Sequence, residues 1–213
     1  MSVPERGVTD PIVWVDCEMT GLDLTTDALI EIAVVVTDSN LVQLGEGVDI
    51  IIKPPSAALE QMTDLVRRMH TTSGLLDELD NGVSLVQAQS QVMAYVQAQV
   101  AQAGKAPLAG NSVSTDRGFI DRDLPTLGKF LHYRTIDVSS IKELTRRWYP
   151  RVYFAAPEKQ GGHRALSDIY DSIDELRYYR AALFARDYSL DTETAKAIAA
   201  EIRATSVRLS TTP

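Results

Sequence analysis

Three segments in the first third of the chain have the pattern of hydrophobic and polar residues that is typical of β-strands. They span residues 12–18 (IVWVDCE), 29–37 (LIEIAVVVT) and 43–53, the last of which is halted by Pro54 and Pro55. The middle segment is almost continuously apolar, as expected for a central strand that is buried on both faces. Because only short turn-forming stretches separate the three segments, the pattern predicts an antiparallel meander.

The rest of the chain has a mainly helical pattern. Ser84 and Gln87 form a capping-box signature, apolar residues follow at helical spacing, and a glycine supplies a stop, so we expect a helix over 84–103. Two short segments, 107–110 (PLAG) and 133–138 (YRTIDV), predict two more strands. The other predicted helices cover 64–79 (as one or two short segments), 114 to a break before Pro125, 139–148, 165–186 and 192–203, with a loop over 151–162.

The order of these elements predicts the fold class. Strands come first and then alternate with helices, which fits one α/β domain built on a mixed five-stranded sheet flanked by helices. Because the 213 residues contain no internal repeat and no long linker, we expect a single domain over 1–213. Its core is expected over about 10–186, with a C-terminal helix and frayed tail over 187–213. The 45% hydrophobic and 23% charged residues exclude a disordered or fibrous chain.

The single cysteine, Cys17, excludes an intrachain disulfide framework and a cysteine-rich zinc site. No apolar run approaches the ~20 residues of a membrane helix, and the first residues lack the apolar core of a secretory signal. We therefore expect a soluble, cytoplasmic protein with no membrane partner.

The formal net charge of −8 argues against long duplex nucleic acid as a partner, because such binding depends on many cation–phosphate contacts. One stretch, 129–151, nevertheless carries six basic and two acidic residues, enough to hold one or two phosphates of a short substrate. Within it Arg134 is the favoured phosphate ligand, because its planar guanidinium suits bidentate contact. Arg146 and Arg147 are equally well explained as solvated helix residues.

Asp16 and Glu18 lie two residues apart at the end of the first predicted strand. The two-residue period of a strand sends both carboxylates to one face and Cys17 to the other. Adjacent carboxylates repel each other and resist desolvation, so a positive group must offset them if they are buried. On its own the pair is also explained as a solvated strand end.

Two further acids extend the pattern. Asp116 follows the short fourth strand and Asp168 begins the long helix over 165–186, each in a first turn, where helix electrostatics alone favours a carboxylate. Four acids with His163 nearby suggest two-metal phosphodiester hydrolysis, with Mg²⁺ or Mn²⁺ as the oxygen-preferring ions. A neutral imidazole can accept the proton of the attacking water, and Gly161 and Gly162 would let His163 swing over the site.

Several segments resemble a known family. The sequences WVDCEMTGLD, NSVSTD and HRALSDI are similar to the three exonuclease motifs of the DEDD superfamily, in its histidine-containing branch. The segments MHTTSGL, HYRTIDVSSIKEL and KQGGHRALSDI narrow the resemblance to the oligoribonuclease family of 3′→5′ exoribonucleases, which hydrolyse very short RNA. The resemblance runs from about residue 10 to 186 and implies a ribonuclease H-like fold. It also implies a homodimer that cleaves dinucleotides to mononucleotides with two Mg²⁺ or Mn²⁺ ions per active site.

The resemblance assigns roles to individual residues. The implied metal ligands are Asp16, Glu18, Asp116 and Asp168, and the implied general base is His163. Leu22 resembles the residue that wedges against the bases, His70 resembles another substrate contact, and Tyr133 resembles one that reaches the active site of a neighbouring subunit. The implied 5′-phosphate cap consists of Ser112, Arg134 and Ser139. The sequence departs from the family at Leu65, where many members carry a tryptophan that stacks on a base.

Two alternatives remain open at this point. A single-stranded DNA exonuclease of the proofreading type would share the acids and His163 but would not require the HYR…DVS segment. A catalytically silent nucleic-acid-binding module is a third interpretation, and the intact set of four acids with His163 argues against it.

Overall fold

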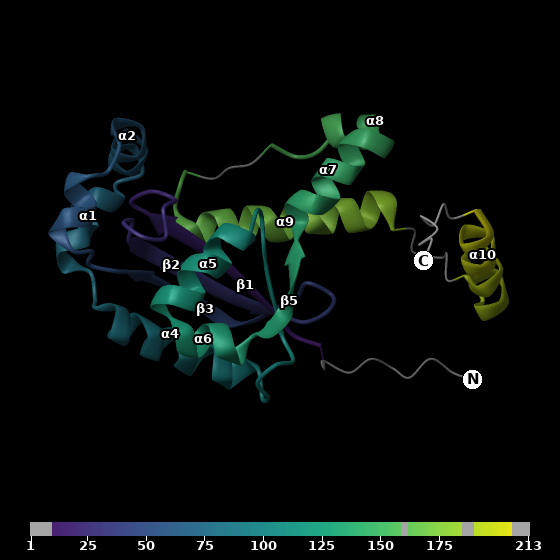
Figure 1. The fold of residues 1–213 in the computed structure, drawn as a ribbon, viewed down its shortest axis with the longest axis horizontal. Coiled ribbons are helices and arrows are strands. Elements are labelled where there is room, and N and C mark those ends of the chain that lie inside the picture. Colours follow the sequence, from purple (N-terminus) through teal and green to yellow (C-terminus); the bar gives the residue numbers. More distant parts are fainter. Residues whose placement is uncertain (1–9, 159–161, 185–189, 206–213) are drawn as a thin grey trace, which may run out of the picture. The chain divides into compact units, whose positions relative to one another are not determined.

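The five predicted strands form one mixed sheet. A computed structural model describes residues 10–158, 162–184 and 190–205. The strands are β1 (Ile12–Met19), β2 (Leu29–Thr37), β3 (Gln43–Ile51), β4 (Pro107–Gly110) and β5 (His132–Asp137). Their order in the sheet is β3-β2-β1-β4-β5, with β2 antiparallel to both β1 and β3, and β4 parallel to both β1 and β5 (Figure 1). The antiparallel meander and the mixed five-stranded sheet are therefore confirmed.

The register of β1 against β2 decides which side chains share a face of the sheet. Asp16 pairs with Ala33, and Glu18 pairs with Glu31. Because directly paired residues point to the same side, these acids share one face. The alternate residues of β1, including Cys17, belong to the main hydrophobic core on the other face. The prediction that Cys17 points away from the two acids is therefore confirmed.

The helices cover the two faces of this sheet. Their bounds are α1 (Ser56–Glu60), α2 (Asp64–Thr72), α3 (Leu75–Glu78), a 3₁₀ turn (Leu79–Asn81), α4 (Leu85–Gln99), α5 (Ser114–Asp123), α6 (Pro125–Phe130), α7 (Val138–Trp148), α8 (Pro150–Phe154), α9 (Ala165–Leu183) and α10 (Thr192–Thr205). The apolar side of α4 packs in the main core with β1 and β2. Figure 1 shows α9 on the side of the sheet opposite to α4, and this is the face that carries the acids.

The helix predicted over 84–103 begins as expected and ends early. Ser84 caps it, and Ser84 and Gln87 form the complete capping box. The helix ends at Gln99 because Val100 adopts an extended backbone, with φ −118° and ψ 104°. Val100 is still buried in the core. Its apolar side chain therefore looked like the last position of a helical stripe, and the prediction was wrong over the last four residues.

Prolines begin helices in this fold, whereas the sequence analysis treated them as breaks. Pro125 and Pro150 are the first residues of α6 and α8, and Pro55 precedes α1. Proline suits this place because the first amides of a helix have no intrahelical partner. The loop predicted over 151–162 was therefore wrong where α8 continues to Phe154. The helix predicted over 165–186 ends at Leu183, and the last two residues of that range lie outside the described residues.

The chain divides into two compact units, one ending at Tyr179 and the other beginning at Arg180. The second unit contains the end of α9 and the helix α10, which was predicted over 192–203. In the part of the chain that the structure describes, no helix combines the length and the apolar character needed to cross a bilayer.

Candidate active site

Two carboxylates at the end of β1 form the base of the site. Burial, followed by the negative charges of Asp116 and Asp168, raises the pKa of Asp16 to about 9. Burial, followed by the charges of Glu31 and Asp168, raises the pKa of Glu18 to about 8. The cause in both cases is the removal of like charges from water, where an isolated carboxylate would titrate near 4.

Asp116, in the first turn of α5, joins this pair directly. Its Oδ1 accepts a hydrogen bond of 3.0 Å from the backbone amide of Cys17, the residue between the two acids of β1. β4 pairs with β1 only at Val13 and Trp14, so the Asp116 carboxylate satisfies an amide of β1 beyond the end of that ladder. Burial raises the pKa of Asp116 to about 6, although the bonds from the backbone oppose this shift.

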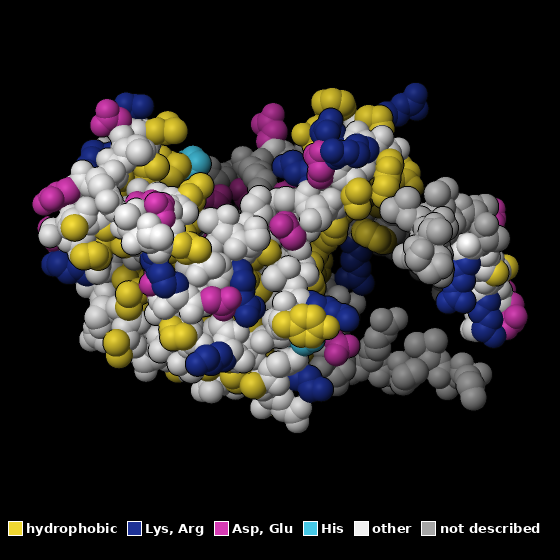
Figure 2. All heavy atoms as spheres, in the orientation of Figure 1, with side chains coloured by type: hydrophobic (Ala, Val, Ile, Leu, Met, Phe, Trp, Pro, Cys, Tyr) yellow, Lys and Arg dark blue, Asp and Glu magenta, His cyan; other side chains and the backbone are white. Residues whose placement is uncertain are grey.

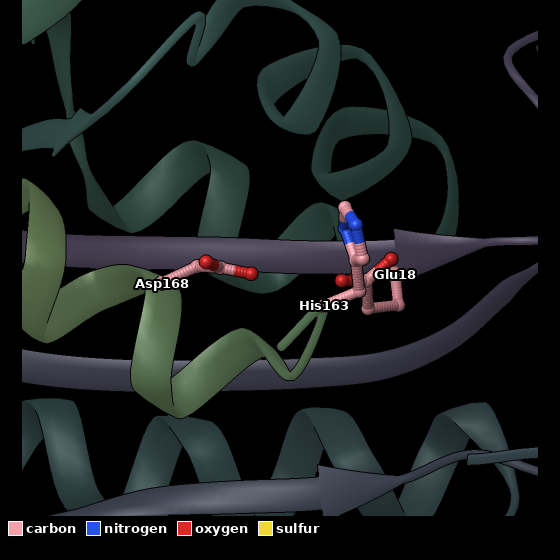
Figure 3. A group of neighbouring side chains, drawn as sticks. All are labelled: Glu18, His163 and Asp168. Atoms are coloured by element: carbon pink, nitrogen blue, oxygen red, sulfur yellow. The ribbon is translucent and has the colours of Figure 1, made fainter. Parts of the chain in front are cut away.

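Asp168 and His163 reach the same place from the last third of the unit. One oxygen of Glu18, one oxygen of Asp168 and one ring nitrogen of His163 all lie within 4.8 Å of one another. Figure 3 shows the three side chains coming from β1, from the first turn of α9 and from the segment just before it. His163 is exposed and has a φ of +56°, a left-handed conformation that is uncommon for a residue other than glycine. Gly161, one of the two glycines predicted to let His163 swing over the site, lies outside the described residues.

The structure thus brings together four acids that are up to 152 positions apart in the sequence, between Asp16 and Asp168. The raised pKa values of Asp16, Glu18 and Asp116 mean that the surrounding protein does not offset the charge of these three carboxylates. Hard divalent cations prefer carboxylate oxygens, and their charge would remove this repulsion. The donor set therefore fits a divalent-metal site, in accord with the acidic cluster around Glu18.

His70, from α2, lies beside this cluster. Its ring is fully buried, and its Nε2 donates a hydrogen bond of 2.9 Å to the carbonyl of Met19, at the end of β1. Its Nδ1 is 3.9 Å from Oε2 of Glu18 and has no hydrogen-bond partner among the described residues. Burial lowers the pKa of His70, so the ring is neutral and Nδ1 is an acceptor beside the acids.

Leu22 stands on the loop between β1 and β2, and its side chain is 73% exposed. Asp27 holds this loop by accepting hydrogen bonds from the Thr20 hydroxyl at 2.9 Å and from the Asp23 amide at 3.0 Å. The guanidinium of Arg122 donates to two carbonyls of the same loop, one of them that of Asp27 at 2.8 Å. An exposed apolar residue is therefore presented from a firmly held loop.

Ser112 and Ser139 lie together at the ends of β4 and β5. Their hydroxyl oxygens are 3.2 Å apart, and the amide of Ser112 donates both to the hydroxyl of Ser139 and to a carboxylate oxygen of Asp137, each at 3.0 Å. Ser112 has a φ of +53°. A Cβ on the preceding Gly110 would lie 2.9 Å from the carbonyl of Val15, so a glycine is needed for the close approach of β4 to β1.

Arg134, the third residue of the predicted cap, and Tyr133, the predicted contact to a neighbouring subunit, are both on β5. Tyr133 is 75% exposed, its ring stacks on that of His132, and the guanidinium of Arg134 lies 5.4 Å from the centre of the tyrosine ring. The contacts found for Tyr133 and Arg134 in the described ranges are with each other and with His132. The structure therefore brings Ser112 and Ser139 together but does not join them to Tyr133 or Arg134.

Three polar residues, Asn111, Glu31 and Arg164, connect the site to α9 and were not among the predicted site residues. Asn111 accepts from the hydroxyl of Ser139 and donates to Ser172 on α9. Glu31 and Arg164 form an ion pair at the start of α9. A glutamate inside the apolar segment LIEIAVVVT was the available signal, because a buried charge requires a partner.

Comparison with known proteins identifies the class. A family model described as Exonuclease (RNase_T) matches residues 13–176, so this is the chain of an exonuclease. The oligoribonuclease of Streptomyces coelicolor is 63% identical over 194 residues, which cover 91% of this chain and 97% of the relative. The oligoribonuclease of Cutibacterium acnes is 57% identical over 190 residues, 89% of this chain and 94% of the relative. The chain belongs to the oligoribonuclease family.

Solved structures agree with the fold. Exonuclease I from Methylocaldum szegediense matches with a TM-score of 0.57 at 18% identity, over 80% of this chain and 40% of that one. E. coli Exonuclease I in complex with a dA16 oligonucleotide matches with a TM-score of 0.59 at 15% identity, over 81% of this chain and 41% of that one. The chain thus spans about two fifths of the length of these structures. The likeness confirms the ribonuclease H-like, mixed-sheet α/β fold.

Proposed function

We propose that this protein is a 3′→5′ exoribonuclease that hydrolyses very short oligoribonucleotides, especially dinucleotides, to mononucleotides. The observation that carries the proposal is the convergence of four acids, two buried and two half-buried, and one exposed imidazole at the end of β1. The relatives from Streptomyces coelicolor and Cutibacterium acnes, which match about nine tenths of the chain, bear the name oligoribonuclease, which supports the choice of substrate.

Asp16, Glu18, Asp116 and Asp168 would hold two Mg²⁺ or Mn²⁺ ions. When bound, such ions supply the positive charge that stabilises the attacking and leaving oxygens of an in-line displacement at phosphorus. His163 is the general base, because it is exposed, lies within reach of Glu18 and Asp168, and can take the proton of the attacking water when neutral. The neutral His70 offers Nδ1 to a hydroxyl of the substrate next to Glu18.

A small polar cap limits the length of the substrate. Ser112 and Ser139 present two hydroxyls at the end of β4, where they can bind a terminal phosphate together with Arg134. Leu22, on its firmly held loop, supplies an apolar contact for a base. In the basic stretch 129–151, Arg146 and Arg147 both pair with Glu143, and Lys142 pairs with Glu175. The positive charge left for the substrate is therefore local, and an overall charge of −8 disfavours a long strand.

The protein acts as a homodimer in the cytoplasm. Each subunit is a single exonuclease domain whose core covers about residues 10–186. Tyr133 is highly exposed, and an exposed apolar patch lies on α7 and α8, where Figure 2 shows hydrophobic and basic side chains gathered. We define this α7–α8 patch as Leu144, Trp148, Tyr149 and Phe154. Exposed aromatic residues grouped in this way are typical of an interface.

Subunit exchange tests the homodimer and the reach of Tyr133 together. Asp116→Ala and Tyr133→Ala proteins should each have low activity on a dinucleotide. After mixing, a mixed dimer would contain one active site with an intact Asp116 and an intact Tyr133 from the neighbouring subunit. Activity should then rise well above the mean of the two variants. Activity equal to that mean would contradict the shared site.

A length series of 5′-labelled RNA tests the function itself. RNAs of two, five and twenty nucleotides and a DNA dinucleotide would be compared with and without a metal chelator. We expect the RNA dinucleotide to be cleaved fastest, with loss of cleavage in chelator. Preference for the twenty-nucleotide RNA would overturn the proposed substrate, equal rates on the two dinucleotides would favour a DNA exonuclease, and no release of mononucleotide with Mn²⁺ present would indicate a binding module.

A further inference from the structure

Glu31 is a carboxylate with no exposed surface on the central strand β2, outside the set of four acids. It lies directly opposite Glu18 in the antiparallel ladder, so the two side chains share one face of the sheet. A buried carboxylate is stable only when hydrogen bonds and opposite charge replace its hydration. The partners of Glu31 therefore indicate its purpose.

Both oxygens of Glu31 are bound to the segment that follows His163. Oε1 accepts a hydrogen bond of 2.9 Å from Nε of Arg164, and Oε2 accepts one of 3.1 Å from the backbone amide of Ala165. Ala165 is the first residue of α9. The carbonyl of Arg164 accepts a bond of 3.0 Å from the amide of Asp168, so Arg164 closes the first turn of this helix.

Glu31, on β2, consequently acts as an N-terminal cap for the helix α9. The amides of the first turn of a helix lack intrahelical acceptors, and a negative charge there is stabilised by the helix dipole. Its position is also set in relation to Glu18, because both residues are held by the same ladder. One carboxylate thus connects the strand that carries Glu18 with the turn that carries His163 and Asp168.

We propose that Glu31 is a positioning residue for the exonuclease reaction, which holds His163 and Asp168 at their distance from Glu18 through Arg164 and the amide of Ala165. This inference rests on the proposed function of the four acids and His163. Glu31 itself does not touch the substrate. We call the contacts of Glu31 with Arg164 and with the amide of Ala165 the Glu31 tether. This tether holds in place the left-handed backbone of His163, the residue immediately before Arg164.

The ion pair between Arg164 and Glu78, on the exposed side of Arg164, provides a matched control. The guanidinium of Arg164 also donates to Glu78, at 2.7 and 3.4 Å, and the Glu78 side chain is 47% exposed whereas that of Glu31 is fully buried. Exposed ion pairs contribute little because water and salt screen them, whereas loss of one partner of a buried pair leaves an uncompensated charge. Glu31→Gln should therefore have a large effect and Glu78→Gln a small one.

A spectroscopic signal separates positioning from general stability. The chain contains three histidines, His70, His132 and His163, so the three ring resonances can be resolved by NMR and assigned by single substitutions. In metal-free Glu31→Gln protein we expect the His163 resonance to shift, while that of His132 on β5 stays in place. A merely structural role would leave the His163 resonance unchanged in protein that is still folded.

Kinetics and metal binding complete the experiment. Relative to wild type, Glu31→Gln should lower kcat for a dinucleotide about 10–100-fold with KM changed less than about threefold, and should weaken Mn²⁺ binding in calorimetry. Glu78→Gln should change both constants less than about twofold. Folded Glu31→Gln protein with kcat within twofold of wild type and an unmoved His163 resonance would overturn the proposal.

If Glu31→Gln does not fold, the variant Arg164→Lys tests the same proposal. Arg164→Lys keeps the positive charge beside Glu31 but removes the Nε contact, and we expect a smaller fall in kcat and the same shift of His163. If that variant has wild-type kcat and resonances, Glu31 is not a positioning residue. The NMR and Mn²⁺ measurements do not depend on turnover, so they test the tether even if wild type cleaves no RNA, a result that would instead refute the proposed function.

Discussion

The two sides of the candidate site are built in opposite ways. On the acid side, Asp16, Glu18 and Asp116 are buried or nearly so, and burial raises the pKa of all three, helped for Asp16 and Glu18 by the negative charges of neighbouring acids. On the cap side, Ser112 and Ser139 are hydrogen-bonded to each other and to neighbouring groups at the surface. The negative charge of the acid side is therefore not offset by the protein, whereas the hydrogen-bonding groups of the cap side already have partners.

This difference separates two tasks within one site. A side that keeps carboxylates in repulsion gains most from cations, so its free energy changes strongly when metal binds. A side made of hydroxyls and backbone amides gains only a few hydrogen bonds from a phosphate, since water or the neighbouring residues already supply such bonds. Damage to the acid side should thus stop chemistry, and damage to the cap side should weaken binding.

Removal of Asp116 is the strongest test of this contrast. We expect Asp116→Ala to remain folded and to lose metal-dependent activity by about three orders of magnitude, because a carboxylate that holds cations cannot be replaced by water alone. Initial rates on a labelled dinucleotide would measure the loss. Asp121→Asn, on the same helix but exposed and paired with Arg117, is the control and should remain within about twofold of wild type. Near-normal turnover of Asp116→Ala would remove that residue from the site.

The pH dependence of stability tests the electrostatic imbalance without any substrate. Asp16 and Glu18 have pKa values of about 9 and 8 in the folded protein, well above 3.8 and 4.5 for the free side chains. Between these limits the folded state binds more protons than the unfolded state, so the free energy of unfolding falls as pH rises. Each group contributes at most about 1.4 kcal/mol per pH unit.

Thermal unfolding between pH 5.5 and 8.5 would measure this slope. In chelator we expect Tm to decrease as pH rises, and in Mg²⁺ we expect the decrease to be smaller, since cations compete better when protons are scarce. An Asp16→Asn/Glu18→Gln double variant should be less sensitive to pH in chelator. If Mg²⁺ raised Tm of the wild type by the same amount at pH 5.5 and at pH 8.5, the proposed uncompensated negative charge of the acid side would be contradicted.

The same contrast explains how much could be predicted from sequence. The strands and the position of the acids on one face follow from the two-residue period of β1, so Asp16 and Glu18 could be placed at once. Asp116 and Asp168 could be placed only as first-turn residues, and their approach to β1 depends on long-range packing such as the bond from Cys17. Four acids together with His163 suggested that they meet at a two-metal site, and the resemblance to a family supported this.

The errors at element ends have local physical causes, whereas the missed residues act through long-range contacts. Val100 continues an apolar stripe in sequence but is buried from an extended segment, so a pattern of hydrophobic positions alone placed the helix end too late. Pro150 begins α8 at a place where a loop over 151–162 was predicted. Glu31 and Asn111 were missed because their roles consist of contacts with α9, more than 60 positions further along the chain.

On the cap side, Arg134→Ala should affect binding more than chemistry. If Arg134 binds the terminal phosphate, its removal should raise KM for a 5′-phosphorylated dinucleotide about tenfold, the value of one charge-assisted contact, while kcat changes little. The same dinucleotide without the 5′ phosphate should show almost no change. Lys129→Ala, another basic residue of the stretch 129–151, is the control. Equal increases in KM with and without the phosphate would contradict a phosphate contact for Arg134.

The smallest effect is expected where the sequence departs from its family. Leu65 lies on α2 and is 71% exposed, at the position where the family resemblance leads us to expect a base-stacking tryptophan. Aromatic stacking is worth about 1–3 kcal/mol per base in other single-strand binders, but the exposed position and the loss of an existing aliphatic contact reduce the gain. We therefore expect Leu65→Trp to lower KM for a dinucleotide about two- to fivefold with kcat unchanged. Val86→Trp, at an equally exposed apolar position on α4, should leave KM unchanged. Because stacking acts on the base and not on the phosphate, the gain should persist when Arg134 is replaced by alanine, and a gain that disappears in the double variant would show that α2 and the cap bind the substrate as one unit.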